Sequence, residues 1–179
     1  RFSQDRRRLA IGVGLSLLTV FLSATVAAVG KHLSGMQVPV SAMIVAQYSI
    51  SFVFTLPSVA RGGVASLRSE RLPMHFLRGL SGVACFYFYF FALSKISLLE
   101  ATLLRNSAPL MVPLLIFLAL REPVSRRSLP PLLLGFAGVV LVLRPGFAEL
   151  SIWHLVALGS GLGLAISMIT TRMLASTEP

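Results

Sequence analysis

Residues 98–120 read LLEATLLRNSAPLMVPLLIFLAL and form the most informative stretch of the 179-residue chain. A helix over this stretch is about 34 Å long at 1.5 Å per residue, which is enough to cross the roughly 30 Å hydrocarbon core of a bilayer. Only Glu100 and Arg105 carry a charge within it. The stretch therefore predicts a transmembrane helix rather than a helix of a water-soluble domain.

The composition of the whole chain points to the same class of protein. Hydrophobic residues make up 55% of the chain and charged residues 12%, whereas soluble domains average about 25% charged residues. A soluble globule could not cover its surface with so few charges, and a disordered chain requires low hydrophobicity. The single cysteine, Cys85, excludes an internal disulfide and any metal site built from several cysteines.

Apolar stretches long enough, or nearly so, to cross a bilayer occur six times along the chain. They leave no room for a soluble domain, and the alternating pattern of a membrane β-barrel is absent. The fifth stretch is the shortest, because a helix of about 15 residues reaches only about 23 Å. We therefore predict an all-α, polytopic transmembrane helical bundle with spans at Leu9–Gly30, Val40–Ala60, Met74–Ser94, Leu98–Leu120, Leu129–Leu143 and Trp153–Leu174.

The basic residues predict the orientation of these spans. The net charge is +10, but the basic residues lie between apolar blocks, so they indicate membrane orientation rather than a nucleic-acid partner. With the amino terminus inside, eleven Lys and Arg fall on the inner side and three on the outer side, and Arg78 and Arg105 lie within spans and are not counted. We therefore expect a multi-pass protein of the cell (inner) membrane with both termini cytoplasmic. The inner group is Arg1, Arg6, Arg7, Arg8, Arg61, Arg68, Arg71, Arg121, Arg126, Arg127 and Arg172, and the outer group is Lys31, Lys95 and Arg144.

The fourth span carries polar side chains inside the membrane, where burying them costs free energy. An ionisable residue inside a span is therefore a functional candidate. Glu100 and Arg105 are five residues apart, so they lie on different faces of a helix and we expect each to face a cavity or a neighbouring helix. Asn106 follows, and Pro109 frees the carbonyl of Arg105 by removing a backbone donor. Together they predict the lining of a polar pathway. Alternatively, the charges extend to the outer headgroups and the prolines only bend the helix.

Other spans hold two further candidates. Arg78 lies near the inner end of the third span, where it either reaches the headgroups or contacts a solute. Gln47 lies deep in the second span and either forms an interhelical hydrogen bond or contacts a ligand. Of the aromatic run Phe86–Phe91, we expect part to face lipid and part to line a cavity wall. The glycines of Gly159–Gly163 predict close approach of neighbouring helix backbones.

Three segments resemble the EamA-type repeat of the drug/metabolite transporter superfamily: ATLLRNSAPL (residues 101–110), LALREPVS (118–125) and LGFAGVVL (134–141). In that family the fourth span carries a proline, a short loop ends in Gly-Glu, and the fifth span is a glycine-rich Leu-Gly run. Glu122 keeps the loop glutamate here, but Arg121 replaces the glycine. Gln47 stands where many members carry an arginine, and the tryptophan common in the first span is missing.

The resemblance implies a ten-helix carrier of two oppositely oriented five-helix repeats, moving a small organic solute by alternating access without a cofactor or covalent chemistry. Residues 1–146 fit one repeat and residues 147–179 the first helix of a second. We therefore expect a partial or truncated carrier, with the other half supplied by a second copy or another chain. Glu100, the only acidic residue expected within the membrane, is a hypothetical site of proton exchange.

Two other classes of function are alternatives. An intramembrane serine protease would use Ser81 of the sequence GLSG (residues 79–82) together with His154. These residues begin spans from opposite sides of the membrane, too far apart for the 2.6–3.2 Å contact that a nucleophile and its base require. A non-transporting membrane scaffold is the second alternative, and the sequence leaves it open.

Overall fold

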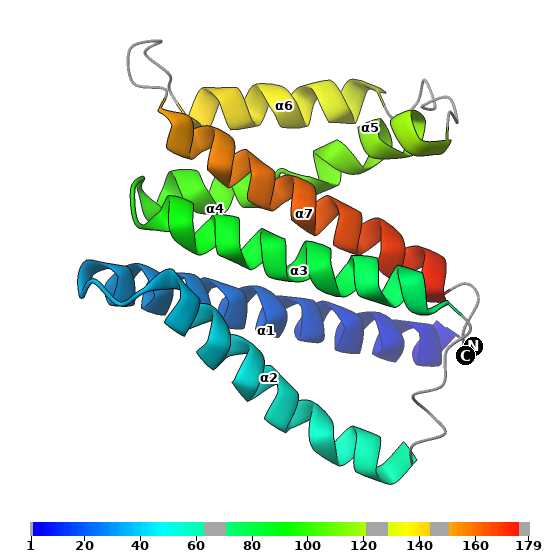
Figure 1. Cartoon of the computed structure of the whole chain (residues 1–179). Coiled ribbons are helices and arrows are strands. Elements are labelled where there is room, and N and C mark those ends of the chain that lie inside the picture. The colour runs from blue at the N-terminus through cyan, green and yellow to red at the C-terminus, as the bar shows by residue number, and fades with distance from the viewer. Residues whose placement is uncertain (1, 63–70, 121–128, 144–150, 176–179) are drawn as a thin grey trace.

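The computed structural model describes residues 2–62, 71–120, 129–143 and 151–175, and every regular element within them is a helix. Successive spans alternate in direction, with α4 and α5 following one another across the same crossing (Figure 1). The start of α1 and the end of α7 lie at the same end of the bundle (Figure 1). The predicted all-α class is confirmed. The helices are α1 (Phe2–Gly35), α2 (Val40–Gly62), α3 (Leu72–Leu93), α4 (Leu98–Asn106), α5 (Ala108–Leu120), α6 (Leu129–Leu143) and α7 (Ile152–Ala175).

The lengths of the helices fit the predicted spans. Among the described residues, five segments are long and apolar enough to cross a membrane, and α6 is a shorter apolar helix. The α6 helix carries Pro130 and Pro131 in its first turn, where the missing N–H groups would have no intrahelical partner in any case. Arg144, which was expected to follow its end, lies outside the described residues.

The fourth span differs from its prediction, because Leu98–Leu120 is not one continuous helix. It is divided at Ser107 into α4 and α5. The N–H of Ser107 still bonds to the carbonyl of Leu103 at 3.0 Å, but Pro109 has no N–H with which to bond the carbonyl of Arg105. The helix therefore stops and restarts inside the expected membrane region.

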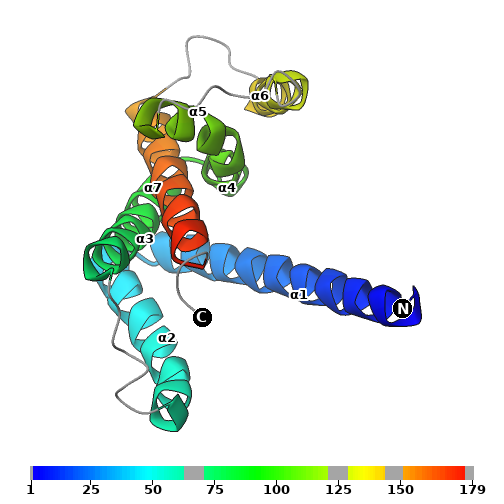
Figure 2. The ribbon, with the colours of Figure 1, turned by 90° about the vertical axis from the view of Figure 1, so that its right-hand side faces the viewer.

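Helix α7 packs against α3, α4 and α5 at the centre of the bundle (Figures 1 and 2). A Cβ atom on Gly161 would lie 2.8 Å from the carbonyl oxygen of Leu104, and one on Gly163 would lie 3.0 Å from that of Ser81. Side chains at these two positions would collide with backbone atoms. The predicted role of these glycines in close helix packing is confirmed.

Helices α1 and α2 extend away from this central group in different directions (Figure 2). In α1, every residue from Leu9 to Val26 is exposed, whereas Ala27 and Gly30 are buried. Gly30 lies against the ring of Phe90 of α3. Within Leu9–Gly35, the α1 helix is thus attached to the bundle near its carboxyl end. An apolar cleft of about 400 Å³ lies between α1 and α2.

Candidate functional site

The amino-terminal end of α4 is closed by a capping box formed by Ser97 and Glu100. The Ser97 hydroxyl accepts the N–H of Glu100 at 3.2 Å, and Glu100 Oε2 accepts from the N–H of Ser97 at 3.0 Å and from its hydroxyl at 2.7 Å. The sequence SLLE dictates this arrangement, because Ser at the N-cap and Glu three residues later satisfy each other's free donors. The cap fixes where α4 begins.

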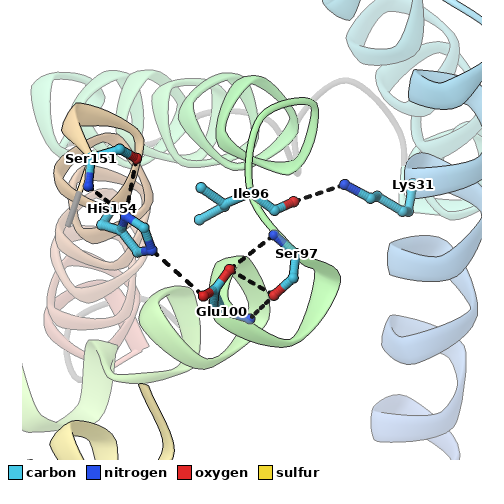
Figure 3. A network of polar contacts seen from close by, with 6 residues as sticks. All are labelled: Lys31, Ile96, Ser97, Glu100, Ser151 and His154. Atoms are coloured by element: carbon cyan, nitrogen blue, oxygen red, sulfur yellow. Dashed lines mark hydrogen bonds and ion pairs between the residues drawn. The ribbon is translucent and has the colours of Figure 1, made fainter. Parts of the chain in front are cut away.

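The second oxygen of the Glu100 carboxylate turns toward α7 (Figure 3). Oε1 lies 3.7 Å from Nε2 of His154, whose side chain is 13% exposed. The Nδ1 atom of His154 accepts the N–H of Ser151 at 3.1 Å. Glu100 therefore faces a neighbouring helix, and both of its oxygens interact with other residues.

Lys31 of α1 completes this network at the same end of the bundle (Figure 3). Its Nζ atom donates to the carbonyls of Leu93 and Ile96, each at 2.7 Å. These carbonyls lie at and just beyond the end of α3, where helices leave acceptors unpaired and a lysine interacts favourably with the helix dipole. Lys31 therefore fastens α1 to the connection between α3 and α4.

The carboxyl-terminal end of α4 holds a different kind of charge. The guanidinium carbon of Arg105 lies 4.7 Å from the ring centre of Phe86 and 4.9 Å from that of Tyr89. Its Nε atom is buried and has no hydrogen-bond partner among the residues that the structure describes. Tyr48 of α2 meets Phe86 edge-on, with 6.2 Å between ring centres. We call Arg105, Phe86, Tyr89 and Tyr48 the arginine cluster.

The arginine cluster suits the binding of an anionic or polarisable group. Stacking of a guanidinium on aromatic faces stabilises the cation while it leaves the N–H groups in the guanidinium plane available. Buried polar groups are nearly always hydrogen-bonded, so an unpartnered buried Nε calls for an explanation. A carboxylate or phosphate can accept from Arg in the guanidinium plane, which is a strong, charge-assisted interaction.

A polar cavity lies further along α3, toward its amino-terminal end. Its volume is about 250 Å³, and α2, α3 and α7 contribute to its walls. The candidate Arg78 is one of the lining residues, so it lies beside a cavity as well as near the end of a span. The cavity is lined by Tyr48, His75, Arg78, Gly79, Gly82 and Ser167.

The remaining candidates lie outside the arginine cluster. Gln47 lines the apolar cleft between α1 and α2, and its Oε1 atom is buried without a partner in the described part of the chain. Asn106 and Pro109 are exposed at the break between α4 and α5. The roles of these three residues stay predictions. No sequence pattern singled out Tyr48, His75 or Ser167, because their positions depend on the packing of three helices.

The proposed protease pair is separated in the structure. The carbonyl of Ser81 packs against Gly163 of α7. His154 lies nine residues earlier on the same helix, or about 13 Å along its axis. The Ser81 hydroxyl donates to the carbonyl of Arg78 at 3.0 Å, so it is engaged away from His154.

The chain was compared with known families and proteins. A model of the EamA-like transporter family matches residues 10–144. A riboflavin transporter of Brucella anthropi is 25% identical over 154 residues, covering 84% of this chain and 54% of that protein. The pseudopaline exporter CntI of Pseudomonas aeruginosa is 27% identical over 166 residues, covering 92% of this chain and 58% of that protein. A probable transport protein of Saccharomyces cerevisiae is 37% identical over 71 residues, 40% of this chain and 20% of that protein.

The two bacterial relatives are longer than the matched region. The chain spans little more than half of the length of each. No solved structure matches the chain significantly. Residues Arg121 and Glu122, which carry part of the sequence resemblance, fall between α5 and α6 and lie outside the described residues.

Proposed function

The chain belongs to the EamA-like transporter family, within the drug/metabolite transporter superfamily, and from this premise we propose that it forms part of a permease for a small organic solute. The solute moves by alternating access through the membrane, with the arginine cluster on its path. We place the protein in the inner membrane of a bacterium, with both termini in the cytoplasm, as the distribution of basic residues favours.

The observation that carries this proposal is the break between α4 and α5 beside an arginine whose buried Nε has no partner among the described residues. Irregular backbone at membrane depth is tolerated where it is buried in protein or lines a water-filled cavity. Transporters commonly place substrate sites at such interrupted helices. The break at Ser107 lies two residues from Arg105, so an irregular backbone and a cation occur at one level.

We further propose that residues 1–146 form one five-helix repeat and residues 147–179 open a second. The tight packing of α7 against α3 and α4 supports this division, because the first helix of one repeat then packs on the other repeat. Under the two-fold pseudosymmetry of inverted repeats, α1 would pack in the same way on the second repeat. The exposed apolar surface of α1 from Leu9 to Val26 fits such a partner, supplied by the other half of the carrier or by a second copy.

Uptake into proteoliposomes tests the proposal. The complete carrier would be reconstituted and assayed with riboflavin and with a panel of labelled small organic acids and neutral amides. Arg105→Ala should lower the uptake of anionic solutes at least tenfold and that of neutral solutes much less, since one charged hydrogen-bond partner is worth about 1.5–3 kcal/mol. Arg105→Lys should recover part of the loss.

Arg172→Ala is the matched control, because Arg172 is exposed at the end of α7 and its loss removes the same charge. Equal losses for anionic and neutral solutes would contradict a direct role of Arg105 in binding. The absence of flux for every solute, from well-folded protein, would favour the membrane scaffold instead.

A further inference from the structure

We propose that the 250 Å³ cavity beside Arg78 is a second binding site, which receives the anionic group of the solute at the inner end of the bundle. We call it the Arg78 cavity. The role of the site in transport rests on the proposed function, whereas the binding of an anion there follows from the residues that line the cavity. It is separate from the arginine cluster and lies nearer to the amino-terminal end of α3.

The space in the Arg78 cavity comes from two glycines on one side of α3. A Cβ atom on Gly79 would meet nothing within 4 Å, and one on Gly82 would meet only the hydroxyl oxygen of Tyr48, at 3.5 Å. The resulting volume of about 250 Å³ is several times the roughly 30 Å³ that a water molecule occupies in the liquid. A carboxylate or phosphate group with part of its carrier molecule fits in this space.

The groups around the Arg78 cavity favour an anion. Arg78 supplies a permanent positive charge, and the hydroxyls of Tyr48 and Ser167 supply possible donors. His75 adds a polar ring to the wall of the cavity. None of the lining residues, all of which belong to the described part of the chain, is acidic. Charge complementarity therefore selects a carboxylate or phosphate.

The Arg78 cavity and the arginine cluster share one face of α3. Arg78, Gly82 and Phe86 are spaced four residues apart, so they lie one above another along the helix. Arg78 and Phe86 are about 12 Å apart along its axis. Tyr48 borders both sites, with its hydroxyl oxygen at Gly82 and its ring against Phe86. An anion leaving Arg105 toward this end of the bundle therefore passes Tyr48 and meets Arg78.

Thiol-modification rates in lipid nanodiscs test this inference without any transport measurement. Ser167→Cys places a thiol in the wall of the cavity, and the native Cys85 is buried. The rates of an anionic reagent, sulfonatoethyl methanethiosulfonate, and of a cationic one, trimethylammonioethyl methanethiosulfonate, would be compared in phosphatidylcholine. Because the same thiolate attacks both reagents and displaces methanesulfinate from each, the ratio of the two rates cancels changes in the reactivity of the thiolate.

We expect the anionic reagent to be favoured, and Arg78→Gln to lower the ratio by about fivefold to tenfold, since one charge acts on the two reagents in opposite directions. Benzoate should slow the modification, whereas the neutral benzamide should not. Arg172→Gln is the charge control and Thr171→Cys, an exposed position one turn along α7, the position control. Neither should reproduce the effect of Arg78→Gln at residue 167.

Two results would overturn the inference. One is a ratio at residue 167 that does not respond to Arg78→Gln. The other is a ratio at residue 167 that does not change with benzoate but falls when phosphatidylglycerol is added, by more than the ratio at Thr171→Cys falls. The bound anion would then be a lipid headgroup. If the modification rates came out as expected but the carrier transported no solute, the proposed function would be contradicted and the anion site would still be supported.

Discussion

The two ends of α4 treat their charged residues in opposite ways. At the amino-terminal end, Glu100 interacts through both oxygens, with Ser97 in a capping box and with His154 of α7. At the carboxyl-terminal end, Arg105 rests on two aromatic rings and keeps a buried Nε without a partner in the described residues. The two residues are only five positions apart in the sequence.

This difference separates a charge that takes part in a helix cap from a charge whose Nε stays without a partner among the described residues, as the proposed solute site requires. The Glu100 carboxylate is engaged within the protein, through Oε2 by the helix cap and through Oε1 by His154 of α7. A guanidinium held by ring faces still presents N–H donors in its own plane. Pathway function is therefore better supported at Arg105 than at Glu100, although the same argument from membrane depth selected both residues.

The largest expected effect is on the packing that holds the break in α4. Gly161→Ala would place a Cβ atom 2.8 Å from the carbonyl oxygen of Leu104, and overpacking against backbone typically costs about 1–3 kcal/mol. We expect a loss of about 3 kcal/mol, measured by thermal unfolding in detergent. Gly159→Ala is the control, because its Cβ atom would meet only the ring of Phe88, at 3.5 Å. Similar stability of both variants would contradict the close contact.

The next largest effect is the loss of stability when the cap at the amino-terminal end of α4 is removed. Ser97→Ala removes the side chain that accepts the N–H of Glu100, and loss of an N-cap costs about 1 kcal/mol. Thermal unfolding should show this loss, with uptake of solute by the folded fraction unchanged. Ser94→Ala, which removes only a bond from the Ser94 hydroxyl to the carbonyl of Phe91, should be closer to the parent protein. Equal effects would remove the special role of the cap.

A smaller effect tests the rings beneath Arg105. Phe86→Leu keeps an apolar side chain but removes one of the two aromatic faces, and a cation–π contact is worth about 0.5–1 kcal/mol or more. We expect about a threefold rise in the half-saturating concentration of an anionic solute. Phe88→Leu alters the same aromatic run without touching Arg105 and should change little. A matching rise for Phe88→Leu would show that only the bulk of the run matters.

The smallest expected effect concerns Glu100→Gln. Glutamine can replace glutamate in a capping box, so only the interaction with His154 is lost, for which we expect at most about 0.5 kcal/mol. The measurement that bears on proton exchange is the pH dependence of uptake, which we expect to be unchanged. A flattened pH profile would instead give Glu100 the coupling role that its position in the sequence suggested, and the comparison between the two ends of α4 would fail.

The sequence was sufficient to predict the class of fold and the spans, because hydrophobicity and length alone fix which segments cross a bilayer. It was not sufficient for the fourth span. Pro109 and Pro113 look equivalent in the sequence, yet Pro113 lies within α5 and only the first proline accompanies a break. The difference comes from tertiary contacts, since the carbonyls at the break pack against Gly161 of α7.

The site was predicted in part, for the same physical reason. Arg105 and Arg78 stand out because charges in apolar spans are rare. Tyr48 and Ser167 carry no such signal, because hydroxyls are common in membrane helices and their neighbours belong to helices distant in the sequence. His154 was considered only as a catalytic base, whereas in the structure it pairs with Glu100.

Because Lys31 holds α1 near its carboxyl end, a small rotation about this attachment moves the other end of the helix by a much larger distance, as in a lever. The contacts of Lys31, Ala27 and Gly30 act as a fulcrum at one end, while the residues from Leu9 to Val26 are exposed. The arm from Lys31 to Leu9 is about 33 Å long. A rocking of about 10° around the fulcrum therefore sweeps its far tip through roughly 6 Å, while the lysine hardly moves.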